Sequence, residues 1–234
     1  LEVETPGDAS GDDKPTPNPT TPSNPKKDDT QQKPKAVPAK KGTTLTVSSK
    51  KLKVKVTSSS KKNPTVTVTK ITDKKAKKLT IPASVKVKGV TYKVTGIADK
   101  AFKNNKKLTT VTIGNNVTKI GKEAFSGCSA LKKVTIGKNV TSIGNKAFYK
   151  CTKLASVTIP AKVTTIGNSA FAGCKNLKKV TVTAGKLKTI NKNAFKGIKK
   201  NAAITVKGKK QAKTALKKKL KKSSIGYVRT WKLK

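Results

Sequence analysis

The sequence predicts a solenoid, in which short repeats stack side by side around one shared apolar core. Apolar residues recur with a period of 23 residues over most of the chain. All five phenylalanines occupy one place in this repeat, and all three cysteines occupy another. A single unit of this size cannot cover its own apolar face, so neighbouring units must stack. We call each unit a row, and we expect about five stacked rows.

Each row opens with a short predicted strand. Leu131 is followed by Val134, Thr135 and Ile136, and the apolar and polar residues alternate. A period of two is typical of a strand with one buried face, so the Val and Ile point inward and the Thr outward. The sequence therefore predicts parallel strands with an outward threonine column, formed by Thr112, Thr135, Thr158 and Thr181.

The second half of each row holds a turn, a second inward pair and a helical turn. Val140 pairs with Ile143, and Gly144 follows at a place that requires either a special backbone angle or a close approach that a Cβ would obstruct. Phe148 and Cys151 are three residues apart, so they share one face of a helical turn. Rows spaced by about 4.8 Å would stack the phenylalanine rings within the favourable range of ~4.5 to 7 Å.

The ends of the array depart from the repeat. Residues 1–42 hold eight of the eleven prolines and few large apolar side chains, which predicts a disordered Pro/Thr-rich linker or stalk. We expect a β-rich N-terminal cap at 43–78, the solenoid at 79–207 and a C-terminal cap at 208–234, made of a helix and an extended segment. Caps are needed because an uncovered edge invites aggregation. Ser84 to Tyr92 in the first row is expected to be an inserted hairpin.

The charge of the chain is strongly asymmetric. From residue 30 onward there are 52 basic and three acidic residues, and every basic residue except Arg229 is lysine. Such a body attracts polyanions in a salt-dependent way. Lysine lacks the bidentate fork with which arginine reads phosphate or guanine, so the composition favours diffuse attraction. Nucleic acid is therefore an unfavoured partner, although the charge permits it.

The sequence offers little for catalysis. The chain has no histidine, and no Asp or Glu follows Glu123. General acid–base pairs, Ser-His-Asp sets and carboxylate metal sites are therefore not expected, and we predict no enzyme activity, cofactor or metal. The cysteine column is interpreted as buried thiols, with a redox relay or soft-metal ladder as the alternative. No run of 18 apolar residues exists, so no membrane span is predicted.

The pattern from Leu131 to Cys151 resembles the BspA-like leucine-rich repeats of bacterial surface proteins. It reads L-x-x-V-x-I-x-x-x-V-x-x-I-G-x-x-A-F-x-x-C, and the match covers about residues 79–207. The resemblance implies a leucine-rich repeat solenoid with a parallel sheet on one side, displayed on the cell or secreted, and adhesive in some members. The family supplies no shared catalytic or binding residue that could be transferred to this chain.

The candidate ligand face is the outer side of the predicted sheet. Solenoids often bind ligands there, and lysines flank the threonine column. The alternative is that threonine is simply a good exposed strand former. A second basic segment, Lys217 to Lys222, is either a patch that binds polyanions or the solvent-exposed side of a capping helix. The candidate residues are Thr112, Thr135, Thr158, Thr181, Lys132, Lys133, Lys178 and Lys179.

The leading hypothesis is a non-enzymatic binding or adhesion scaffold on the bacterial cell surface or secreted, with a cationic body that associates with anionic wall polymers or binds a protein. The alternative is a structural repeat module of a larger surface protein with no ligand of its own. A nucleic-acid binder is a third hypothesis. A monomer is favoured. Removal of a signal peptide is the simplest explanation of a chain that starts at Leu1 without methionine, and a fragment of a larger protein would look the same.

Overall fold

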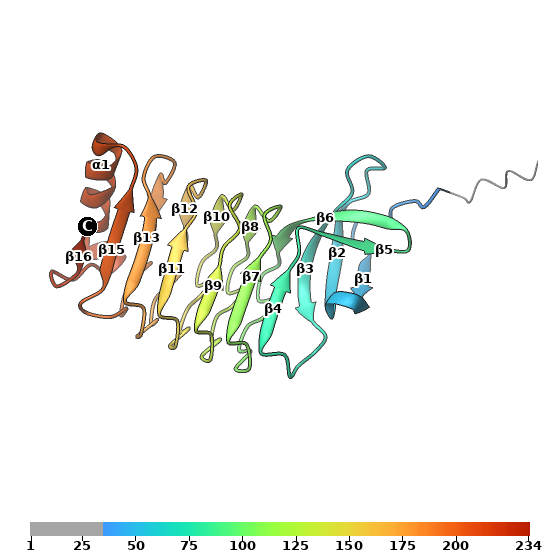
Figure 1. Cartoon of the computed structure of the whole chain (residues 1–234), viewed down its shortest axis with the longest axis horizontal. Helices are drawn as coiled ribbons and strands as arrows, with labels where there is room; N and C mark the ends of the chain where they lie inside the picture. Colours follow the sequence, from blue (N-terminus) through green and yellow to red (C-terminus); the bar gives the residue numbers. More distant parts are fainter. Residues whose placement is uncertain (1–34) are drawn as a thin grey trace, which may run out of the picture. The chain divides into compact units, whose positions relative to one another are not determined.

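The computed structural model describes residues 35–234, of which Ala36–Lys234 form one compact unit. Most of the predicted linker thus lies outside the described residues. Seven strands form a parallel sheet that lies in front in Figure 1, which we call the front sheet. Its order is β4 (Lys78–Ile81), β7 (Thr110–Ile113), β9 (Lys133–Thr135), β11 (Ser156–Ile159), β13 (Lys179–Thr183), β15 (Ala203–Lys207) and β16 (Lys232–Leu233).

A second sheet, which we call the rear sheet, runs along the other side of the same core. Its first four strands contain four to eight residues each, and its last four contain two residues each. Its order is β1 (Thr44–Val47), β2 (Leu52–Ser58), β3 (Thr65–Ile71), β6 (Val90–Ile97), β8 (Lys119–Ile120), β10 (Ser142–Ile143), β12 (Thr165–Ile166) and β14 (Thr189–Ile190). The six coils from β4 to β15 confirm the predicted solenoid, with one row more than the expected five.

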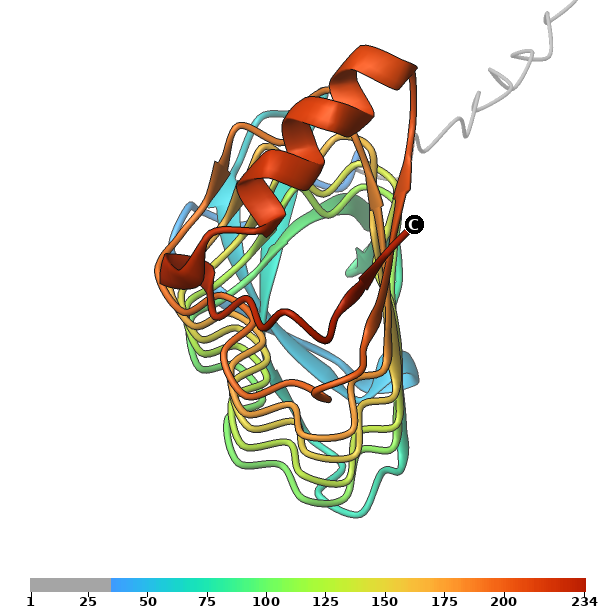
Figure 2. The same ribbon diagram turned by 90° about the vertical axis from the view of Figure 1, so that its left-hand side faces the viewer.

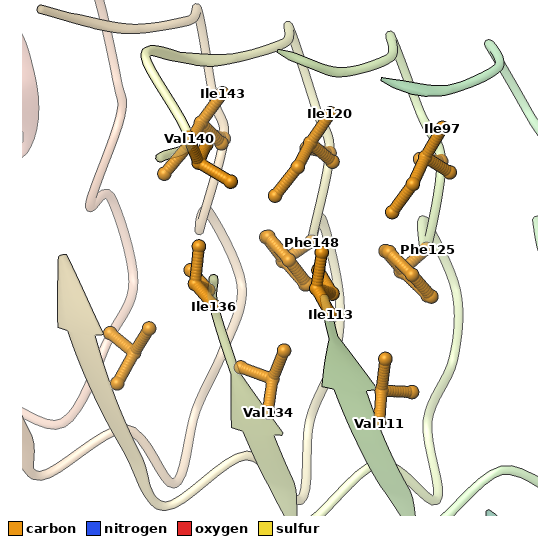
Figure 3. Close-up of a cluster of buried hydrophobic side chains, with 14 of the residues drawn as sticks. Ile97, Val111, Ile113, Ile120, Phe125, Val134, Ile136, Val140, Ile143 and Phe148 are labelled. Atoms are coloured by element: carbon orange, nitrogen blue, oxygen red, sulfur yellow. The ribbon is translucent and has the colours of Figure 1, made fainter. Parts of the chain in front are cut away.

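Like residues stack on like residues throughout the core. Val111 lies in register with Val134, and Ile120 with Ile143. Figure 3 shows these columns, with Ile97, Ile120 and Ile143 above the rings of Phe125 and Phe148. All of these side chains are buried. Residues one repeat apart in the sequence therefore lie next to each other in the core. The rows superpose when viewed along the stack (Figure 2).

The predicted helical turns are short turns whose amides alternate between two kinds of partner. The Cys128 N–H donates to the Phe125 carbonyl within its row at 3.2 Å, whereas the Phe125 N–H donates to Ala147 in the next row at 2.8 Å. This alternation needs a left-handed residue in each row, for example Glu123 and Lys146 with φ of 55° and 53°. The third side of the solenoid is therefore also held by hydrogen bonds between rows.

The phenylalanine column forms the predicted ladder. The centroids of successive rings are 5.0, 5.3, 5.2 and 5.5 Å apart, and their planes lie within 16° of parallel. Trp231 ends the ladder by meeting Phe195 edge-on, with centroids 6.4 Å apart. The aromatic stack thus runs through five rows and is closed by the C-terminal cap.

The glycine of the repeat marks a close contact between rows. A Cβ on Gly144 would lie 2.7 Å from the backbone of Gly121 and Lys122. Real Cβ atoms do not approach backbone so closely, so the close approach, and not a left-handed backbone angle, is the reason for glycine at this place.

The N-terminal end is closed by β1 to β3 and by the inserted hairpin. β5 (Ser84–Val87) pairs antiparallel with β6, and the two turn residues Lys88 and Gly89 are both left-handed, which suits a two-residue hairpin turn. The last residues assigned to the linker also contact this end. The Ala39 N–H donates to the Tyr92 hydroxyl and the Gly42 N–H to the Val56 carbonyl, both at 2.8 Å. Both donors are backbone N–H groups, and composition does not reveal such bonds.

The C-terminal cap supplies hydrogen-bond partners that a further row would otherwise provide. Within the array, the Thr141 carbonyl accepts the Thr164 N–H at 2.8 Å. The corresponding carbonyl of the last row, Lys188, accepts instead from the Lys219 ammonium of α1 (Lys210–Leu220) at 2.7 Å. The Phe195 N–H likewise donates to Ile225 in a short helical turn, Ser223–Ile225, at 2.9 Å. Figure 2 shows α1 lying across the end of the stack.

We expect Phe148→Ala to lower the free energy of unfolding by about 3 to 5 kcal/mol, because the ring is fully buried between two others. Denaturant titration measures the change. Tyr149→Ala, at the neighbouring half-buried position, is the control and should cost much less. An unchanged unfolding midpoint for Phe148→Ala would contradict the ladder as a source of stability.

Lys219→Met should lower stability by about 1 kcal/mol, since it leaves the Lys188 carbonyl without its charged donor. Lys218→Met, on the exposed side of the same helix, removes the same charge without breaking a bond that the structure shows. Thermal unfolding of the two variants compares them directly. Equal melting temperatures would show that Lys219 has no capping role.

Candidate functional site

The predicted threonine column lies on the outer face of the front sheet. Thr112 sits between buried Val111 and Ile113 and points away from the core. The strand register places Thr112 beside Thr135, and Thr158 beside Thr181. Thr80 and Thr205 extend the same column at its two ends.

The four candidate lysines lie at the start of two strands of the front sheet. Lys133 and Lys179 are the first residues of β9 and β13, two places before a column threonine, so they point to the same side of the sheet. Lys132 and Lys178 directly precede these strands, and their N–H groups donate to Thr109 and Ala155 of the preceding rows. All four side chains are exposed. The structure therefore brings the four threonines, Lys133 and Lys179 onto one outer face, and Lys132 and Lys178 lie exposed beside it at the start of the same strands.

A second threonine column, which the sequence analysis missed, serves the fold. The hydroxyls of Thr118, Thr141 and Thr164 each donate to a carbonyl of the preceding row at 3.0 to 3.1 Å. By contrast, the hydroxyls of Thr112, Thr135 and Thr158 have no hydrogen bond within residues 35–234. The sequence signal that could have revealed this column is a threonine that recurs once per repeat in the second half of each row. The hydroxyls of Thr112, Thr135 and Thr158 therefore keep both their donor and their acceptor capacity for a ligand.

The three carboxylates of the described residues are all engaged, and each lies in a different place. Asp73 accepts from the Lys51 ammonium at 2.9 Å, and this hydrogen bond lowers the pKa of Asp73. Lys103 pairs with Glu123 and lowers its pKa in the same way. Asp99 accepts the Lys122 N–H at 2.7 Å. Each carboxylate thus holds a local contact, and no two of them form an acid–base pair.

The cysteine column is buried in the core. The thiols of Cys128, Cys151 and Cys174 donate to phenylalanine carbonyls of a neighbouring row at 3.1 to 3.2 Å. Burial raises the pKa of Cys128 to about 12. The contact with Cys174 and burial together raise the pKa of Cys151. The thiolate is the reactive form, so Cys128 and Cys151 are poor nucleophiles and metal ligands. Among residues 35–234, no group of His, Cys, Asp and Glu could hold a metal ion.

The basic segment from Lys217 to Lys222 belongs to the capping helix and its end. Leu216 and Leu220 are buried against the stack, and Lys219 binds the last row. Lys218, Lys221 and Lys222 are exposed to solvent. The position of these lysines supports the interpretation of the segment as the solvent-exposed side of the capping helix. None of the helices within residues 35–234 is long and apolar enough to cross a membrane.

Thiol labelling of the native protein should be slow at pH 8, because all three thiols are buried and the raised pKa of Cys128 keeps it protonated. Labelling in concentrated guanidinium, followed by mass spectrometry, is the control and should modify all three. Rapid modification of the folded protein would contradict the buried hydrogen-bonded column.

Comparisons with known proteins agree with this geometry. The model of the "BspA type Leucine rich repeat region" matches residues 95–214 with six copies. No curated protein matches the chain. A leucine-rich repeat protein from Bacteroides capillosus shares 30% identity with a TM-score of 0.52, over 59% of this chain and 97% of that one.

The pneumococcal vaccine antigen PcpA shares the fold as well, with 25% identity and a TM-score of 0.60 over 71% of this chain. The match spans only 45% of the length of that antigen, so the whole antigen offers no direct guide to this chain. The family model covers half of the residues, and its range of 95–214 includes the front-sheet strands from β7 to β15. The chain belongs to the BspA-type leucine-rich repeat family.

Proposed function

We propose that this protein is a non-enzymatic binding scaffold of the bacterial exterior, retained there by anionic wall polymers. The observation that carries the proposal is the charge. From residue 30 onward the chain has 52 basic residues and only three acidic ones. The three carboxylates are already engaged within the protein. The surface therefore presents a large uncompensated positive charge, which attracts polyanions over several ångströms and weakens as salt rises.

The family and the fold support the same proposal. BspA-type proteins are typically associated with the cell surface, and leucine-rich repeats act as protein-interaction modules. The stacked rows supply a rigid body, because every row is bonded to its neighbours on three sides. Such a scaffold can hold its exposed lysines at fixed positions along the stack.

A binding panel tests the proposal. Isolated bacterial cell wall, heparin, DNA and fibronectin are each titrated with the full chain at low and at moderate salt. Binding to walls and to the other polyanions that disappears by about 0.3 M salt is the expected result, since exposed charges are then screened. Salt-resistant binding to fibronectin alone would favour an adhesin that binds a protein. Failure to bind walls even at low salt would overturn wall retention and favour a structural module without a ligand.

A further inference from the structure

Pairs of lysines recur in alternate rows along the front sheet. The rows of β4, β9 and β13 carry a pair at the start of the strand, and the rows between them carry small or neutral residues there. The pairs are Lys77–Lys78, Lys132–Lys133 and Lys178–Lys179, and the intervening residues are Thr109–Thr110, Ala155–Ser156 and Ala202–Ala203.

The strand register turns this alternation into one straight column. Lys78 lies beside Thr110, and Thr110 beside Lys133. Lys133 in turn lies beside Ser156, Ser156 beside Lys179, and Lys179 beside Ala203. Every lysine of the three pairs is exposed. Positive charge therefore repeats once per two rows across the strands.

The two-row period defines a spacing. Adjacent strands lie about 4.8 Å apart, so successive lysine pairs are about 9.6 Å apart. The phosphates of one nucleic-acid strand recur about every 3.4 Å along a helix, much more densely than this column. A polymer with one negative charge per two sugar rings has a comparable, sparse spacing. The periodicity thus favours a polysaccharide over a nucleic acid.

The threonine column runs parallel to the lysine pairs, two residues further along each strand. The hydroxyls of Thr112, Thr135 and Thr158 are exposed and are not used within residues 35–234. A hydroxyl both donates and accepts, which suits the hydroxyls of a sugar chain. No carboxylate belongs to the strands of this sheet, so nothing on it opposes an anionic ligand.

We infer that the outer face of the front sheet binds a linear anionic polysaccharide with one carboxylate per disaccharide, lying across the strands along the stack. The lysine pairs would meet its carboxylates, and the threonine hydroxyls would meet its sugar hydroxyls. The inference rests on the proposed function, because it assigns the attraction for anionic polymers to one face. It adds a ligand class and a register to that attraction.

Two variants with equal loss of charge test the face. The sheet variant changes Lys132, Lys133, Lys178 and Lys179 to Gln. The helix variant changes Lys217, Lys218, Lys221 and Lys222 to Gln and leaves the capping Lys219 intact. The probe is a hyaluronan hexasaccharide, which offers one carboxylate to each lysine pair, and calorimetry at low salt measures Kd.

The sheet variant should bind the hexasaccharide about tenfold more weakly than the unaltered chain, and the helix variant within about twofold of it. Equal losses in the two variants would show that net charge alone binds the sugar. The inference would then be overturned, while wall binding in the panel would leave the proposed function standing. Absence of hexasaccharide binding by a chain that binds walls would overturn the inference in the same way.

A third variant keeps the net charge and breaks the period. It combines Lys132→Ala and Lys133→Ser with Ala155→Lys and Ser156→Lys, which moves one pair by one row at positions that are not fully buried. Its affinity for the hyaluronan hexasaccharide should fall about tenfold, whereas its affinity for a galacturonate hexasaccharide, charged on every sugar, should stay within about twofold. Unchanged binding of hyaluronan would overturn the two-row register. Unchanged melting temperatures would verify that the variants are folded.

Discussion

The hydrogen-bonded contact between one row and the next is the constraint on which this structure depends. Backbone amides on three sides of each row donate to the neighbouring row, and they set the spacing of every column at once. Side chains one period apart must then stack on each other. A ladder of phenylalanines and a column of thiols are stable under this constraint, and Gly144 is required because the backbones come so close.

The same constraint creates a problem at the two ends, where amides and carbonyls would lack partners. The protein solves it with elements outside the repeat. At the N-terminal end the hairpin and three antiparallel strands continue the rear sheet. At the C-terminal end Lys219 and the carbonyl of Ile225 take the places of a missing row, and Trp231 closes the aromatic stack. A lysine that composition assigns to a cationic patch is thus part of the cap.

Fixed columns also decide what remains for function. The phenylalanines, thiols, glycines and one threonine column are occupied by packing or hydrogen bonds. The front threonine column and the lysine pairs of the front sheet are not needed for stacking, so their arrangement is free to serve a ligand. Because the strands are held at a fixed spacing, the rows that carry lysine set the distances between the charges. Flexible loops could not hold charges at such fixed distances.

The sequence by itself determined the solenoid, the inward columns and the placement of Thr112 and Lys133 on one side, because a period of 23 and an alternation of two are properties of the chain alone. The tertiary structure decided which polar groups have hydrogen-bond partners and which do not. The hydroxyl of Thr141 is bonded and that of Thr135 is free, although both recur with the same period. The left-handed residues, the rear sheet and the capping role of Lys219 depend likewise on contacts between rows, and local pattern does not specify those contacts.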